Sequence, residues 1–106
     1  MVAIVPRDFV PDIAENHLVS QFQSIMLERR LSAVFQPIMD LRNRRFHGFE
    51  ALVRGPSGSP LERPDRLFAC ARRCDCVAEF DRLCVQTAVE GFAAAGLAGH
   101  LFLNVT

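Results

Sequence analysis

The sequence predicts one small α/β domain, with elements in the order helix, β-hairpin, helices and a final strand. Three observations lead to this prediction. The chain has 106 residues, of which 50% are hydrophobic and 23% charged, so it can form a single core and does not resemble a disordered chain. Apolar residues recur at helical spacing in residues 12–30 and 78–95. Between these segments, two runs of strand-forming residues flank a turn at residues 42–45.

Residues 12–30 are predicted to form the leading helix. Asp12 has a side chain suited to an N-cap, and Glu15 stands three residues later as its capping-box partner. An apolar stripe then repeats at the spacing of one helix face. The stripe consists of Leu18, Phe22, Ile25 and Met26. Residues 1–30 are therefore assigned to a leading segment and helix, and residues 31–106 to the rest of the domain.

Residues 31–41 and 46–54 are predicted to form the two strands of the hairpin. Pro37 cannot donate a ladder hydrogen bond, which favours an edge position for the first strand. A loop rich in glycine, proline and serine follows at residues 55–64. Pro64 then suits the first turn of a helix. The apolar face of that helix comprises Leu67, Phe68, Ala71 and Cys74.

A further helix is predicted over residues 78–95, and Gly96 is a suitable residue to end it. Its inward-facing residues are Phe80, Leu83, Cys84, Thr87, Ala88 and Phe92. The chain closes on a short apolar strand at residues 100–106. A strand, a helical segment and another strand in succession predict a parallel pair with a right-handed crossover. The last strand has no following element to cover it.

The charge balance gives no reason to expect a nucleic acid or an anionic membrane as a partner, because 12 basic residues offset 12 acidic ones. We interpret the cluster of Arg42, Arg44 and Arg45 as a solvated turn. No apolar run approaches the ~20 residues of a membrane span. The apolar start of the chain is too short for a signal peptide. We therefore expect a cytoplasmic protein, or a piece of a larger one.

The four cysteines are expected to be free thiols. They are Cys70, Cys74, Cys76 and Cys84. Their spacing lacks the paired C-x2-C units of a structural zinc site. Without a secretory signal, reduced thiols are the expectation.

Three residues of the second strand point to a ligand-binding surface. Side chains alternate along a strand, so Glu50, Leu52 and Arg54 share one face. If that face met only water, Leu52 would be exposed between two charged neighbours. A ligand explains the mixture better, because a carboxylate suits a cation, leucine an apolar group, and a guanidinium an anion such as phosphate.

Two amides each allow a structural role and a ligand-binding role. Asn104 lies in the final apolar strand, on the predicted face of Phe102 and Thr106. It is either a core residue with a hydrogen-bond partner or a donor of its side-chain oxygen to a hard cation. Gln36 has the same ambiguity, with a hydrogen bond to neighbouring backbone as its structural role.

The ordered segments "FQPIMDLRNRRFHGFEALVRG", "RPDRLFACA" and "LFLNVT" resemble the opening of the EAL domain, a family of phosphodiesterases and receptors for the bacterial second messenger cyclic di-GMP. The resemblance covers residues 31–106 and implies the N-terminal third of a TIM-like (βα) barrel whose first strand is antiparallel to the others. It implies that Glu50 and Asn104 bind Mg²⁺ or Mn²⁺ and that Gln36, Leu52 and Arg54 contact the dinucleotide. In complete members, two metal ions activate a water that opens cyclic di-GMP to pGpG.

The resemblance also implies an incomplete site. A TIM barrel needs ~250 residues, and the family's later carboxylates and catalytic lysine have no counterpart here. We therefore expect no turnover and no bound metal for these residues alone. A second interpretation is a non-catalytic module that forms a homo-oligomer through its exposed barrel edge. A third is a remnant without a retained role.

Overall fold

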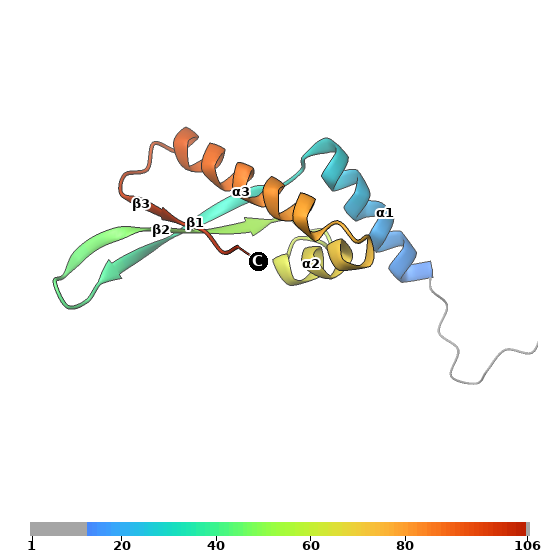
Figure 1. Ribbon diagram of the computed structural model, residues 1–106, viewed down its shortest axis with the longest axis horizontal. Helices are drawn as coiled ribbons and strands as arrows, with labels where there is room; N and C mark the ends of the chain where they lie inside the picture. Colours follow the sequence, from blue (N-terminus) through green and yellow to red (C-terminus); the bar gives the residue numbers. More distant parts are fainter. Residues whose placement is uncertain (1–12, 106) are drawn as a thin grey trace, which may run out of the picture.

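The computed structural model describes residues 13–105, and these form an open three-stranded sheet with three helices (Figure 1). The predicted order of elements is confirmed. In chain order they are α1 (Ile13–Glu28), β1 (Ser32–Asp40), β2 (Arg45–Arg54), α2 (Pro64–Arg73), α3 (Val77–Ala94) and β3 (His100–Phe102). The predicted cap at Asp12 and the strand residue Thr106 lie outside the described residues.

The sheet has the strand order β1–β2–β3, with β1 and β2 antiparallel and β2 and β3 parallel. The hairpin and the parallel pair are therefore both confirmed. The register places Gln36 opposite Glu50 across the hairpin, while Phe102 of β3 lies beside Glu50 on the other side. Strand β1 lies at the edge of the sheet and has β2 as its one neighbour among the described strands. An edge strand can hold Pro37, which has no N–H to donate to a second neighbour.

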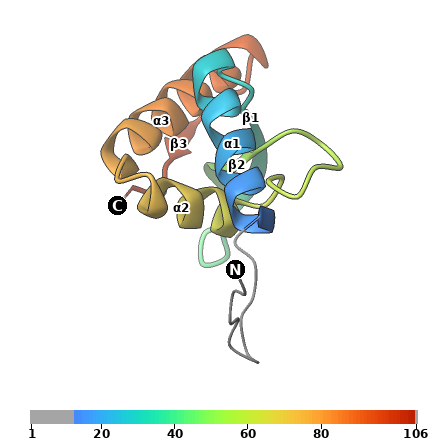
Figure 2. The ribbon, with the colours of Figure 1, turned by 90° about the vertical axis from the view of Figure 1, so that its right-hand side faces the viewer.

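The core lies where the three helices meet, beside the loop that follows β2 (Figure 2). Phe80 is completely buried and makes edge-to-face contacts with Phe22 and Phe68, at ring-centroid distances of 5.6 and 4.8 Å. Such contacts add to the burial of aromatic surface, which is the main stabilising term here. Helix α3 also packs on the sheet, where Phe92 meets the rings of Phe35 and Phe49.

Proline, glycine and residues with positive φ lie at the ends of the helices. Helix α2 begins at Pro64, as predicted. Helix α3 ends just before Gly96, whose φ of 65° is the left-handed conformation that glycine adopts readily. Helix α1 ends before Arg29, which itself has a positive φ of 54°. Within the described range, no helix combines the length and hydrophobicity that a bilayer span requires.

Strand β3 is shorter than predicted, because it ends at Phe102 and not at residue 106. Asn104 and Val105 leave the sheet and are exposed to solvent. Of the two alternatives for Asn104, the interpretation as a core residue is therefore wrong. The reason is physical: among the described residues β3 pairs with β2 alone, so its other edge has no ladder to hold the chain extended.

Candidate functional site

Four of the five predicted site residues lie on one face of the β-hairpin. Glu50, Leu52 and Arg54 alternate along β2, and the register places Gln36 directly opposite Glu50. Residues opposite each other in an antiparallel pair project from the same face. Gln36 is exposed, whereas the three β2 residues are half-buried. The face therefore presents a carboxylate, an amide, an apolar side chain and a guanidinium together.

The fifth residue, Asn104, joins this group from the end of the chain. Its Nδ2 donates a hydrogen bond of 2.9 Å to Oε1 of Glu50, across a separation of 54 residues. Parallel pairing of β2 with β3 makes this possible, because both strands run in the same direction and their carboxyl ends lie at the same end of the sheet. A small pocket of about 140 Å³ adjoins this point and is lined in part by Leu52, Pro64, Phe68 and Asn104.

Arg54 keeps most of its hydrogen-bonding capacity free. Its Nη1 donates a hydrogen bond of 3.0 Å to the carbonyl oxygen of Val53. Among the described residues, the ion pairs are Arg30–Glu28 and Arg63–Asp65, so Arg54 has no carboxylate partner there. A guanidinium carries five N–H donors. The remaining donors on this half-buried side chain suit an anion such as a carboxylate or a phosphate, which a guanidinium often binds through two parallel hydrogen bonds.

Glu50 and Asn104 fit a hard cation in chemical type but supply few ligands. Carboxylate and amide oxygens are the donors that Mg²⁺ and related ions prefer. In the present arrangement Asn104 turns its amide nitrogen toward Glu50, so its oxygen must rotate to bind a metal ion. Within residues 13–105, no group of three or more His, Cys, Asp or Glu side chains could hold a metal ion. Two such side chains could fill only part of the coordination sphere of six or more oxygen atoms that these ions require.

A neighbouring ring cluster was not predicted. The ring of His47 lies 5.3 Å from that of Phe102 and 5.8 Å from that of His100. The position of Phe102 follows from the parallel register, which pairs Phe102 with Glu50. The position of His47 follows from a register shift near Ile38, which leaves His47 unpaired. No feature of the sequence reveals that irregularity.

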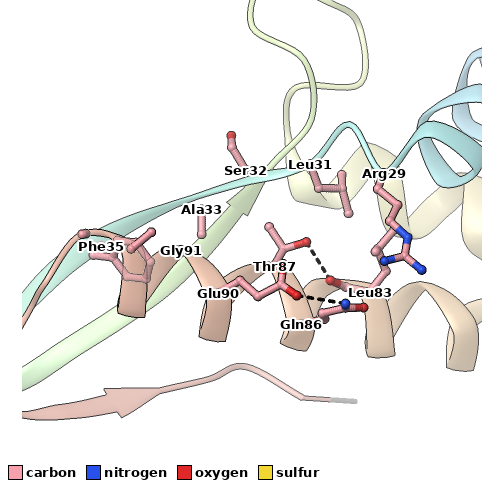
Figure 3. Close-up of a pocket in the computed structure, with 12 residues that line it drawn as sticks. Arg29, Leu31, Ser32, Ala33, Phe35, Leu83, Gln86, Thr87, Glu90 and Gly91 are labelled. Carbon is pink, nitrogen blue, oxygen red and sulfur yellow. Dashed lines mark hydrogen bonds between the residues drawn. The ribbon is translucent and has the colours of Figure 1, made fainter.

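A larger groove, of about 690 Å³, lies between β1 and α3 (Figure 3). Ala33 and Phe35 line it, and they project from the sheet face opposite to Gln36 and Glu50. Polar side chains around the groove are bonded within α3: Thr87 donates to the Leu83 carbonyl at 2.7 Å, and Gln86 donates to Glu90 at 3.0 Å. The groove is therefore separate from the predicted site.

All four cysteines are free thiols, and Cys84 lines the small pocket beside Asn104. Cys70 and Cys84 are buried. Burial raises the pKa of the Cys84 thiol to about 12, and the negative charge of Asp81 adds to the shift. Burial likewise raises the pKa of Cys70. Neither thiol is a nucleophile at neutral pH, because the thiolate is the reactive form.

Comparisons with known proteins identify the family and the fold of this chain. A family model described as "EAL domain" matches residues 26–106. The chain is similar to the FimX EAL domain from Pseudomonas aeruginosa bound to c-di-GMP, with 20% identity and a TM-score of 0.66 over 84% of this chain and 36% of that one. It is also similar to the Xanthomonas citri FimX EAL domain in complex with c-diGMP, with 22% identity and a TM-score of 0.65 over 87% and 38% of the two chains.

These two likenesses concern the fold, and they identify the sheet and helices as part of a (βα) barrel. The chain spans 36% and 38% of the two structures, a little over a third of each. A search among curated proteins found no significant match.

Proposed function

This chain belongs to the EAL domain family, and from that membership we propose that it supplies part of a site for cyclic di-GMP and a divalent metal ion. The two similar solved structures are EAL domains with the dinucleotide bound. The hydrogen bond between Glu50 and Asn104 is the observation that carries the proposal. It joins Glu50 of β2 to Asn104, which follows the end of β3, beside the face that also presents Arg54.

Each site residue has a role that follows from its chemistry. Glu50 and Asn104 would bind Mg²⁺ or Mn²⁺ through oxygen atoms. Arg54 would donate hydrogen bonds to a phosphate of the dinucleotide. Leu52 lies between them and offers an apolar contact, while Gln36 can donate to or accept from a base or ribose.

The activity proposed for the complete domain is metal-dependent hydrolysis of cyclic di-GMP to pGpG, in which bound metal ions supply an activated water. The part played by this chain is to hold the dinucleotide: Arg54 positions a phosphate, and Leu52 limits the access of water on one side. We propose that residues 1–106 alone do not hydrolyse the dinucleotide. A two-metal centre needs more oxygen ligands than Glu50 and Asn104 can supply, and within the described residues no group of three or more His, Cys, Asp or Glu side chains could hold a metal ion.

Titration of the purified chain with cyclic di-GMP in the presence of Mn²⁺ tests the proposal, with calorimetry for binding and chromatography for pGpG. The expected result is weak binding without turnover. Arg54→Gln should lower the affinity about tenfold or more, because it removes charge-assisted hydrogen bonds to phosphate. The control is Arg82→Gln, which changes an exposed arginine of α3. Equal affinities for both variants would refute the role of Arg54, and release of pGpG would refute the inactivity of this chain.

A second candidate function is a non-catalytic module that assembles with a second copy of itself. Exposed apolar side chains at the open end of the sheet favour it. Val34, Phe102 and Val105 are 48%, 37% and 67% exposed. Phe102 and Val105 lie at or just beyond β3, whose outer edge is unpaired among the described residues, whereas Val34 lies on β1 at the opposite edge. Strand pairing between chains covers edges of this kind.

A further inference from the structure

The turn between β1 and β2 forms a projecting apolar tip. In Figure 1 the hairpin extends past α3 and the segment leading into β3, away from the helical core. Leu41 at the turn is 88% exposed, and Met39 beside it is 52% exposed. Phe46, which pairs with Met39, is 45% exposed as well, so apolar surface gathers at this end of the hairpin. Such a gathering, unlike single scattered side chains, is typical of an interaction site. We call residues 39–46 the hairpin tip.

The hairpin tip is held in a defined shape. The carboxylate of Asp40 accepts hydrogen bonds from the backbone N–H of Arg42 at 3.0 Å and from Asn43 Nδ2 at 2.9 Å. The hydrogen bond from the Asn43 side chain is the main reason that the pKa of Asp40 lies below its ordinary value. Below the turn, the ring of Phe46 packs against that of Phe49 at 5.0 Å. Leu41 is therefore presented on an ordered support.

The hairpin tip is also positively charged. Arg42, Arg44 and Arg45 surround the apolar apex, and Asp40 is the one acidic residue among them. Asp40 directs its carboxylate into the turn. Within the described part of the chain, none of the three arginines forms an ion pair with a carboxylate. The charge is therefore available to an anionic partner, although the chain as a whole is neutral.

We propose that the hairpin tip docks onto an anionic lipid bilayer, with Leu41 and Met39 in the headgroup region and the three arginines at the level of the lipid phosphates. Apolar insertion and basic charge together give peripheral attachment where neither suffices alone. A nucleic acid would use the arginines but would leave the apolar apex in water. This assignment goes beyond the interpretation of the three arginines as a solvated turn.

The docked orientation leaves the candidate site free. The hairpin tip and Arg54 lie at opposite ends of β2, which places them about 30 Å apart at 3.3 Å per residue. A bilayer at the tip therefore faces the amino end of β2, and the dinucleotide face stays open to solvent. Attachment and ligand binding can be altered separately.

Co-sedimentation of the full chain with phosphatidylcholine vesicles, with and without phosphatidylserine, tests the proposal. We expect binding to the vesicles that contain phosphatidylserine. Leu41→Ser should reduce the partition coefficient about tenfold, because it removes the inserted side chain. Replacing Arg42, Arg44 and Arg45 by glutamine should reduce it about fivefold for each arginine.

Matched controls come from elsewhere on the surface. Leu27→Ser changes a leucine that is 86% exposed on α1, and a second triple variant changes the exposed Arg66, Arg72 and Arg82 to glutamine. Both should bind nearly as well as the unaltered chain, and circular dichroism checks that every variant is folded. The proposal fails if the unaltered chain does not bind or if the controls lose as much binding as the tip variants. It also fails if Leu41→Ser has no effect while a DNA oligonucleotide binds through the same arginines.

Discussion

At the scale of single residues, Asn104 shows how a side chain can serve a site from outside the regular structure. It lies beyond the last hydrogen-bonded residue of β3 and is exposed, yet its amide reaches Glu50. An exposed hydrogen bond of this kind adds on the order of 1 kcal/mol to stability. The contact therefore has little structural value and leaves both side chains available for a ligand.

Replacing Asn104 by aspartate is expected to destabilise the chain and to make it respond to Mn²⁺. The variant loses the Nδ2 donor and places a second carboxylate beside Glu50, so the free energy of unfolding should fall by about 1 kcal/mol. A divalent cation that binds both carboxylates should restore it. Urea unfolding with and without Mn²⁺ measures both effects. Asn104→Ala is the control, and an equal response to Mn²⁺ in both variants would contradict the proposed metal site.

At the scale of elements, the approach of β3 to β2 depends on the absence of a side chain at Gly48. A Cβ at this position would collide with the carbonyl oxygen of His100, the residue paired with Gly48 in the parallel ladder. Because the obstacle is backbone, a rotamer change cannot relieve it. Gly48 therefore sets the spacing that places Asn104 beside Glu50.

Gly48→Ala is expected to lower the free energy of unfolding by about 1–3 kcal/mol, as overpacking does elsewhere. It should also loosen β3, which hydrogen exchange at residues 100–102 would detect. The matched control is Gly91→Ala on α3, where the added Cβ would meet the ring of Phe35 at 3.4 Å. That distance is an ordinary contact, and alanine favours the helix by about 1 kcal/mol. Similar losses in both variants would argue against the proposed role of Gly48.

The elements that could be predicted are those whose ends are determined by nearby residues in the sequence. Pro64 begins α2, Gly96 follows α3, and Pro37 lies on an edge strand. The alternation along β2 also predicted which side chains share a face, because it depends on strand geometry alone. In contrast, the length of β3 and the irregular position of His47 depend on pairing with distant residues. Such tertiary effects leave no local signal.

At the scale of the whole molecule, the sheet is open on the side of β3. Neither the edge of β3 nor the apolar side chains at the carboxyl end of the sheet are covered by other described residues. In the related structures the matched region is a little over a third of a larger chain. An isolated chain with such an edge has a physical reason to associate.

We expect the purified chain to form a dimer or larger oligomer whose mass rises with concentration in static light scattering. Phe102→Ser and Val105→Ser should shift it toward the monomer, because they remove apolar surface beside the open edge. Val89→Ser is the matched control, since Val89 is 50% exposed on α3, away from that edge. A monomer at all concentrations would contradict the proposed self-association.

The separation of 54 residues between Glu50 and Asn104 has a kinetic consequence. The antiparallel hairpin closes across a turn of a few residues and can form early in folding. The parallel strand must wait until the intervening helices are in place, because closing a long loop costs entropy that nearby contacts do not incur. We therefore expect the candidate site to assemble later than the hairpin. During synthesis, Glu50 is present in the chain well before Asn104 is added. Local unfolding of β3 would separate Asn104 from Glu50 while the helical core stays folded.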